Sequence, residues 1–69
     1  MEKIKITANG KKFEIASGQT VAEFARALGL NPQRCVVELN QKALKFADFE
    51  NKTLQAGDVL EILSLVAGG

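Results

Sequence analysis

The sequence predicts an α+β domain in which a mixed sheet of about four to five strands packs against one helix. Two segments with alternating apolar residues flank the pair Asn9-Gly10 and predict a hairpin. A segment with helical spacing follows, and the later segments are again rich in β-forming residues. A hairpin, one helix and further strands bury a single apolar sheet face only if the helix lies across that face, which gives two layers.

Length and composition predict one folded domain. The 69 residues are 46% hydrophobic and 25% charged, an ordinary balance for a globular protein. Nine Lys and Arg against eight Asp and Glu leave a formal net charge of +1, and the two signs are interleaved along the chain. We therefore expect no nucleic-acid partner and no membrane partner, because both bind to a basic field.

The cysteine and histidine counts limit the chemistry of any site. Cys35 is the only cysteine and the chain has no histidine, which excludes an internal disulfide and the usual zinc ligands. We expect no metal site, a cytoplasmic location, and a Cys35 that packs in the core rather than acting as a nucleophile. The chain starts without the apolar stretch of a signal peptide, and its longest apolar stretch, near residues 59–67, is too short to span a bilayer.

Residues 3–8 alternate between apolar and polar side chains, which predicts a half-buried strand. Asn9-Gly10 favours a type I′ turn, because both central residues of that turn need a positive φ. A two-residue loop fixes the register of the second strand and continues its apolar face. The predicted cross-strand pairs are Ile6 with Phe13, Ile4 with Ile15, and Lys5 with Glu14.

Residues 20–30 change to the spacing of a helix, with apolar residues at i, i+3, i+4 and i+7 on one stripe. Thr20 followed by Glu23 predicts a capping box at the start of this helix, so Glu23 is expected to be a cap rather than a catalytic acid. Gly29 suits the left-handed position after the last turn, and Pro32 prevents continuation. The stripe consists of Val21, Phe24, Ala25 and Leu28.

The second half of the chain predicts two more strands with an irregular segment between them. Residues 35–39 form a short β-rich segment that ends in a turn at residues 40–41. Residues 43–54 have no clear period, and we expect an irregular loop with a helical turn at 47–50. A tight turn then leads into the last strand, 59–64, which would be parallel to the first strand if the two are neighbours. All four phenylalanines are expected in the core: Phe13, Phe24, Phe46 and Phe49.

The order and length of these elements resemble the β-grasp fold shared with ubiquitin, and more narrowly the ThiS/MoaD family of small sulfur-carrier proteins. The resemblance covers essentially the whole chain, and its short length and ending are more similar to the thiamine carriers than to the longer molybdopterin subunit. Gln41 departs from the family, which often has glycine after the asparagine, and this affects the expected turn geometry. The resemblance rests on the segments TVAEFARALGL, VVELN, ADFENKTL, AGDVLEIL and the final AGG.

The resemblance implies a β-grasp domain over residues 1–64 and a flexible tail over residues 65–69 that ends in Gly-Gly. In such carriers the last carboxylate, here that of Gly69, is adenylated by an E1-like (ThiF-like) adenylyltransferase that uses ATP and Mg²⁺. Sulfur from a donor such as a cysteine desulfurase then gives a thiocarboxylate, which a ThiG-like thiazole synthase uses in thiamine biosynthesis. The chain itself is expected to be a protein cosubstrate rather than an enzyme, and to bind no cofactor.

The two final glycines suit this chemistry, because residues without a Cβ can enter a narrow channel in an extended form. Gly68 and Gly69 would bring the carboxyl carbon close to a nucleotide phosphate. The same fold and ending are also compatible with a MoaD-like small subunit of molybdopterin synthase, or with another ubiquitin-like carrier or modifier. The sequence leaves these alternatives open.

An outward-facing apolar patch before the tail is the expected partner-binding surface. If Leu60 and Ile62 point into the core, alternation directs Glu61 and the residues at 63 and 65 outward. The alternatives are incidental exposure of these leucines or cover by residues 43–54. The expected partner-binding residues are Val36, Leu63, Leu65, Val66 and Ala67.

Overall fold

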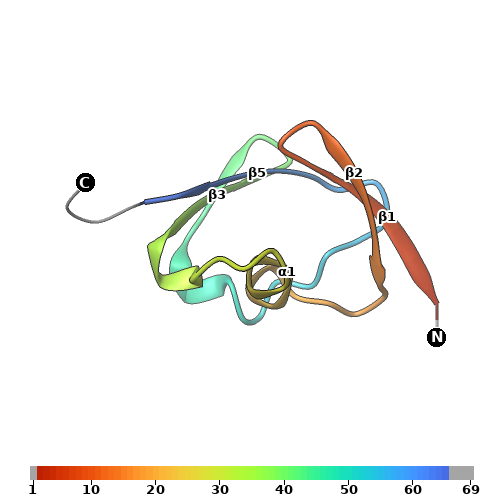
Figure 1. The fold of residues 1–69 in the computed structure, drawn as a ribbon, viewed down its shortest axis with the longest axis horizontal. Helices are drawn as coiled ribbons and strands as arrows, with labels where there is room; N and C mark the ends of the chain where they lie inside the picture. Colours follow the sequence, from red (N-terminus) through yellow and green to blue (C-terminus); the bar gives the residue numbers. More distant parts are fainter. Residues whose placement is uncertain (1, 66–69) are drawn as a thin grey trace.

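The computed structural model describes residues 2–65 and shows two layers, a five-stranded sheet with one α-helix across its inner face (Figure 1). The spatial order of the strands is β2-β1-β5-β3-β4, so the last strand of the chain lies in the middle of the sheet. This arrangement confirms the predicted two-layer fold with a mixed sheet. No helix within residues 2–65 is long and apolar enough to cross a membrane.

The first two strands, β1 (Lys3–Ala8) and β2 (Lys11–Ala16), form the predicted hairpin. Asn9 and Gly10 have φ values of +52° and +80°, as the type I′ turn requires. All three predicted cross-strand pairs are present in the register, so the turn residues and the apolar pattern are consistent with one another.

The central strand β5 (Val59–Ser64) runs parallel to β1 and antiparallel to β3 (Cys35–Leu39). Its pairing with β1 is short and ends at Ala8 and Leu60. The side chain of Asn9 then extends the contact: its Nδ2 donates to the Ile62 carbonyl (3.0 Å) and its Oδ1 accepts from the Ile62 N–H (2.8 Å). The hairpin turn is therefore fastened directly to the middle strand.

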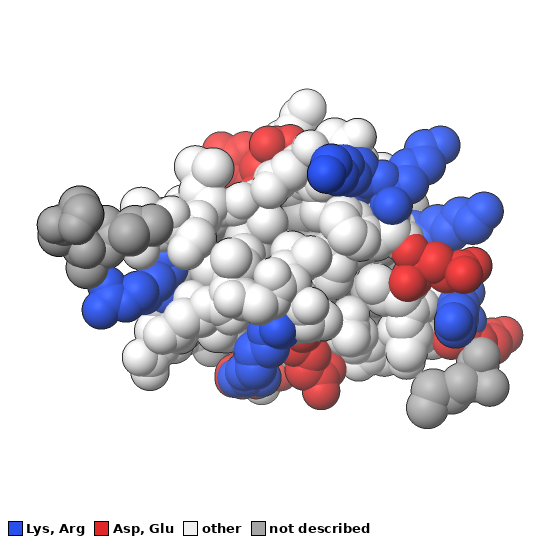
Figure 2. Space-filling view, viewed as in Figure 1, with Lys and Arg blue, Asp and Glu red and all other residues white. Residues whose placement is uncertain are grey.

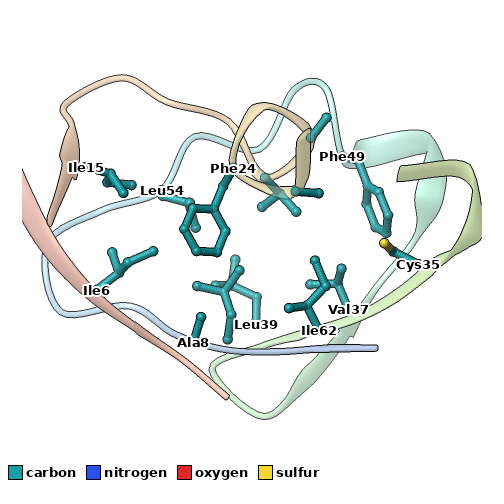
Figure 3. Packing of buried hydrophobic residues seen from close by; sticks show 14 residues of the cluster. Ile6, Ala8, Ile15, Phe24, Cys35, Val37, Leu39, Phe49, Leu54 and Ile62 are labelled. Atoms are coloured by element: carbon teal, nitrogen blue, oxygen red, sulfur yellow. The ribbon is translucent and has the colours of Figure 1, made fainter. Parts of the chain in front are cut away.

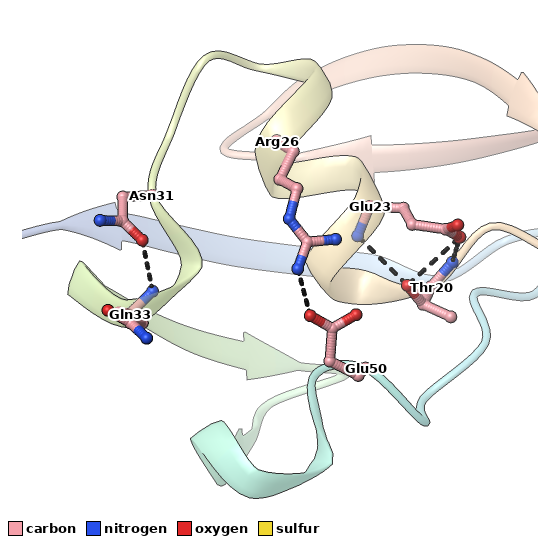
Figure 4. Close-up of polar contacts among 6 residues, drawn as sticks. All are labelled: Thr20, Glu23, Arg26, Asn31, Gln33 and Glu50. Carbon is pink, nitrogen blue, oxygen red and sulfur yellow. Dashed lines mark hydrogen bonds and ion pairs between the residues drawn. The ribbon is translucent and has the colours of Figure 1, made fainter.

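The helix α1 (Val21–Ala27) has the predicted caps (Figure 4). Leu28 was wrongly assigned to the buried stripe, because the helix ends before it and Leu28 is an exposed C-cap residue. The Thr20 hydroxyl accepts from the Glu23 N–H (3.1 Å), and the Glu23 carboxylate accepts from the Thr20 N–H (2.9 Å). At the other end Gly29 has a φ of +83°, and its N–H donates to the Arg26 carbonyl (2.9 Å). Arg26 also forms an ion pair with Glu50, which is solvent-exposed and therefore contributes little stability.

Three short elements complete the described chain: the 3₁₀ helix η1 (Pro32–Arg34), the strand β4 (Lys42–Leu44) and the 3₁₀ helix η2 (Phe46–Asp48). The expectation of an irregular loop from residue 43 was wrong at its start, because β4 pairs with β3 across a second tight turn. Asn40 and Gln41 both have positive φ in this turn, +52° and +71°. The predicted helical turn at 47–50 is present as η2, slightly earlier in the chain.

The core fills the space between α1 and the inner face of the sheet (Figure 3). Phe24 projects from the helix into the middle of the core, between Ile6 on one side and Ile62 on the other, while Phe49 lies beside Cys35. Phe24 and Phe49 are buried as predicted, and Phe13 is partly buried. Phe46 was wrongly assigned to the core, since it is 53% exposed: it packs edge-on against Phe49, whose ring occupies the buried position.

Replacing Gln41 with glycine should raise the free energy of unfolding by about 0.5–1 kcal/mol, because an L-residue with a side chain is strained in the left-handed region. Urea unfolding measures the change. Gln55→Gly is the matched control, since Gln55 has no positive φ and glycine there only adds entropy to the unfolded chain. Equal losses of stability in both variants would contradict the strained turn.

Candidate functional site

The outer patch consists of Val36, Leu63 and Leu65 on the sheet face opposite the helix. Val36 and Leu63 are direct cross-strand partners, and they are 48% and 64% exposed. Leu65 is 57% exposed. Strand alternation places Val36 and Leu63 outward, and Leu65 just after β5 is exposed as predicted, so residues 43–54 do not cover the patch. Their role in partner binding stays a prediction.

The chain remains attached to the body for one residue beyond β5. Ser64 pairs with Cys35, and the Leu65 N–H donates to the Arg34 carbonyl (2.6 Å). In Figure 1, β5 runs along the sheet to one edge of the molecule. The other predicted site residues, Val66, Ala67, Gly68 and Gly69, lie outside the described residues.

A shallow hollow adjoins the outer patch on the same face. It has a volume of about 260 Å³ and is lined by Val36, Glu38, Glu61 and Leu63. Glu38 and Glu61, which we call the acidic pair, are direct cross-strand partners and both are exposed. Alternation predicted that Glu61 faces outward, but sequence reasoning missed Glu38, because its position depends on the register between β3 and β5.

Charged side chains of both signs lie over the surface of the molecule. Figure 2 shows several Lys and Arg side chains at the end formed by the β1–β2 hairpin, with acidic side chains beside them, and a further acidic group on the upper, sheet side of the view. On the hairpin, Lys5 lies opposite Glu14, so these two charges are matched across the strands. The acidic pair has no such match: β4 places Ala43 on the other side of Glu38.

Cys35 has the structural environment that the sequence predicted. Its side chain is buried, and Sγ donates to the Asn31 carbonyl (3.3 Å). Burial raises the pKa of the Cys35 thiol, because the charged thiolate is poorly solvated there. The thiol therefore stays protonated at neutral pH and is a weak nucleophile.

The remaining carboxylate considered from the sequence, Asp58, also has a structural role. Its Oδ1 accepts from the Asn40 side-chain amide (3.0 Å), and its Oδ2 accepts from the Gln55 N–H (2.7 Å). Asp58 therefore joins the turn before β5 to the turn after β3, as expected of a turn residue. Within residues 2–65, no group of three or more metal-ligating side chains could hold a metal ion.

Comparison with protein families places the sequence among known carriers. A family model described as the ThiS family matches residues 2–69, which includes both final glycines. A comparison with curated proteins finds no significant match.

Two solved structures are similar over almost the whole chain. The crystal structure of the thiamine biosynthesis protein ThiS from Geobacter metallireducens is 32% identical, with a TM-score of 0.79, and the match covers 96% of this chain and 100% of that chain. An NMR solution structure of a thiamine biosynthesis protein from Geobacter metallireducens is 30% identical, with a TM-score of 0.77 and coverages of 96% and 88%.

A ubiquitin-like domain of another protein shares only the fold. It is 18% identical, with a TM-score of 0.58, and the match covers 97% of this chain and 77% of that chain. Together with the ThiS structures, it confirms the expected ubiquitin-like β-grasp fold.

Alkylation of Cys35 should be slower in the folded protein than in the same protein unfolded in urea. Burial raises the pKa of the thiol, so the reactive thiolate fraction of the folded protein increases only at a pH above the ordinary thiol range. Mass spectrometry after timed treatment with iodoacetamide across pH 7 to 10 gives both rates. Equal rates and equal pH midpoints in the folded and unfolded protein would contradict a buried thiol.

Proposed function

Because this chain belongs to the ThiS family, we propose that it is a sulfur carrier protein of thiamine biosynthesis. The observation that carries the proposal is the family match over residues 2–69, which joins the β-grasp body to the glycine pair at 68 and 69. In this role the chain is a cosubstrate, and its partners carry out catalysis. The observed outer patch gives these partners a surface to bind.

The reactive group in this proposal is the carboxylate of Gly69. An α-carboxyl group has a pKa near 3.3–3.7, so it is an anion and a poor electrophile at neutral pH. An E1-like adenylyltransferase would let the carboxylate attack ATP, which releases pyrophosphate and leaves an acyl adenylate. A donor such as a cysteine desulfurase supplies sulfur as a persulfide, whose terminal sulfur attacks the carbonyl carbon and releases AMP. A thiol reductant then supplies two electrons and cleaves the S–S bond of the resulting acyl disulfide. The product is a thiocarboxylate, and ATP and Mg²⁺ bind the partner.

The hydrogen bond at Leu65 limits how far the reactive group can reach. With Leu65 held against Arg34, the four residues 66–69 can span at most about 13 to 14 Å. Gly68 and Gly69 add no Cβ, so the end of the segment can enter a narrow channel. The body must therefore dock close to the entrance of the partner's active site.

The outer patch is suited to that docking because it adjoins the start of the segment. Val36 and Leu63 are cross-strand partners, and Leu65, two residues further toward the C-terminus, is also exposed. Ordering residues 66–69 in a channel costs conformational entropy, so burial of the patch must supply a large part of the binding energy. We propose that the ThiF-like adenylyltransferase and a ThiG-like thiazole synthase both use it.

Incubation of the chain with ATP, Mg²⁺, a sulfur donor and a ThiF-like partner should convert it to a thiocarboxylate. Intact-mass analysis should show the gain expected when sulfur replaces one oxygen. A variant that lacks Gly69 is the control, and it should show no gain because its last residue no longer reaches the reacting centre. A Lys-linked adduct in place of the gain would instead indicate a ubiquitin-like modifier.

Leu63→Asp should raise the KM for the carrier in the adenylation reaction by about tenfold or more, since burial of a leucine contributes about 1.5–3 kcal/mol. The kcat and the thermal unfolding midpoint should stay unchanged, because Leu63 is exposed in the free protein. Steady-state release of pyrophosphate measures both constants.

Phe46→Asp is the matched control for this substitution. Phe46 is also more than half exposed, but it lies on η2, away from the outer face of β3 and β5. Its KM should match that of the wild type. A similar KM for all three proteins would remove the outer patch from the docking surface.

A further inference from the structure

The acidic pair is an arrangement that the fold itself does not require. Glu38 and Glu61 face each other directly across β3 and β5, and both side chains are exposed. Within residues 2–65 neither carboxylate forms an ion pair or a side-chain hydrogen bond. Like charges directly opposite each other destabilise a sheet. The pair therefore has no stabilising role in the free protein.

The hollow beside the acidic pair combines these carboxylates with apolar walls. Val36 and Leu63 form the neighbouring cross-strand pair and line the same space of about 260 Å³. A ligand that fits this surface needs a cationic head and an apolar stem. Arginine has both, because its planar guanidinium presents several donors to carboxylates and is less strongly hydrated than the ammonium of lysine.

The negative charges of the two reactants in the adenylation step favour the adenylating partner as the source of this arginine. Its active site brings together ATP and the Gly69 carboxylate, which are both anions, so we expect cationic groups around its entrance that steer them in. The short reach from Leu65 places the sheet face of the carrier next to that entrance. A cation on the partner rim and the acidic pair on the carrier are then complementary.

We propose that the hollow receives one arginine side chain of the adenylating partner. The guanidinium donates to both Glu38 and Glu61, and the aliphatic stem packs on Val36 and Leu63. This inference rests on the proposed function, since the partner is the enzyme that activates Gly69. Binding relieves the repulsion between the two carboxylates, so the contact forms only in the complex and orients the carrier on its partner.

The test compares two double variants with the same change of net charge. Glu38→Gln/Glu61→Gln removes the acidic pair, whereas Glu14→Gln/Glu50→Gln removes two carboxylates that lie opposite Lys5 and pair with Arg26. Adenylation is measured against carrier concentration at several salt concentrations, together with thermal unfolding. The first variant should show a KM about tenfold higher, an unchanged kcat, a weaker salt dependence of KM and an unfolding midpoint equal to or above that of the wild type. The second should keep the wild-type KM within about twofold.

Several results would overturn the inference. A KM and salt dependence equal to those of the control variant would show that the acidic pair does not contact the partner. A lower unfolding midpoint with a lower kcat would assign the pair a structural role. A defect confined to sulfur transfer from the thiocarboxylate would assign it to the acceptor, and a loss of self-association in sedimentation would assign it to a second copy of the chain.

The same experiment separates this inference from the proposed function. A wild-type chain that is adenylated normally, beside an acidic-pair variant with unchanged kinetics, overturns the inference alone. A wild-type chain that no ThiF-like partner adenylates overturns the proposed function, and this inference with it.

Discussion

The pairing of β5 with β1 on one side and with β3 on the other is the constraint on which the rest of the structure depends. It buries Leu60 and Ile62, which are 0% and 3% exposed, under the helix. Because side chains alternate along a strand, the same pairing turns Glu61 and Leu63 outward. A slip of one residue would exchange the two faces, so the packing of the core also fixes the outer face and the place where the chain leaves the sheet.

Local sequence signals predicted the elements that have strong local chemistry. Asn9-Gly10 fixed the first hairpin and its register, and the Thr20 capping box fixed the start of the helix. The strand β4 was missed because it is only three residues long and because Gln41 is not a typical residue for positive φ. The exposure of Phe46 depends on which of two nearby rings enters the core, and periodicity does not decide that competition.

Some features of the candidate site could be predicted from the sequence, and others could not. Alternation along a single strand predicted that Leu63 and Leu65 face outward. Two other features needed the tertiary structure, because they join residues far apart in the sequence: the acidic pair of Glu38 with Glu61, and the bond from Leu65 to Arg34. No local sequence pattern predicts how β3 and β5 align, because the packing of their inward-facing residues in the core sets that register.

The burial of the Cys35 thiol keeps the folded body from reacting with the activated end of the chain. An acyl adenylate reacts with any accessible thiolate, so a reactive cysteine on the carrier would compete with the sulfur donor. Cys35 is the first residue of β3, and its side chain is buried on the inner face of the sheet. Its thiol donates a hydrogen bond to the Asn31 carbonyl, and burial raises the pKa of the thiol. The thiol is therefore protonated and inaccessible when the terminus is activated. Under the proposed function, the body supplies recognition without chemistry of its own, which leaves the sulfur to be added only at Gly69.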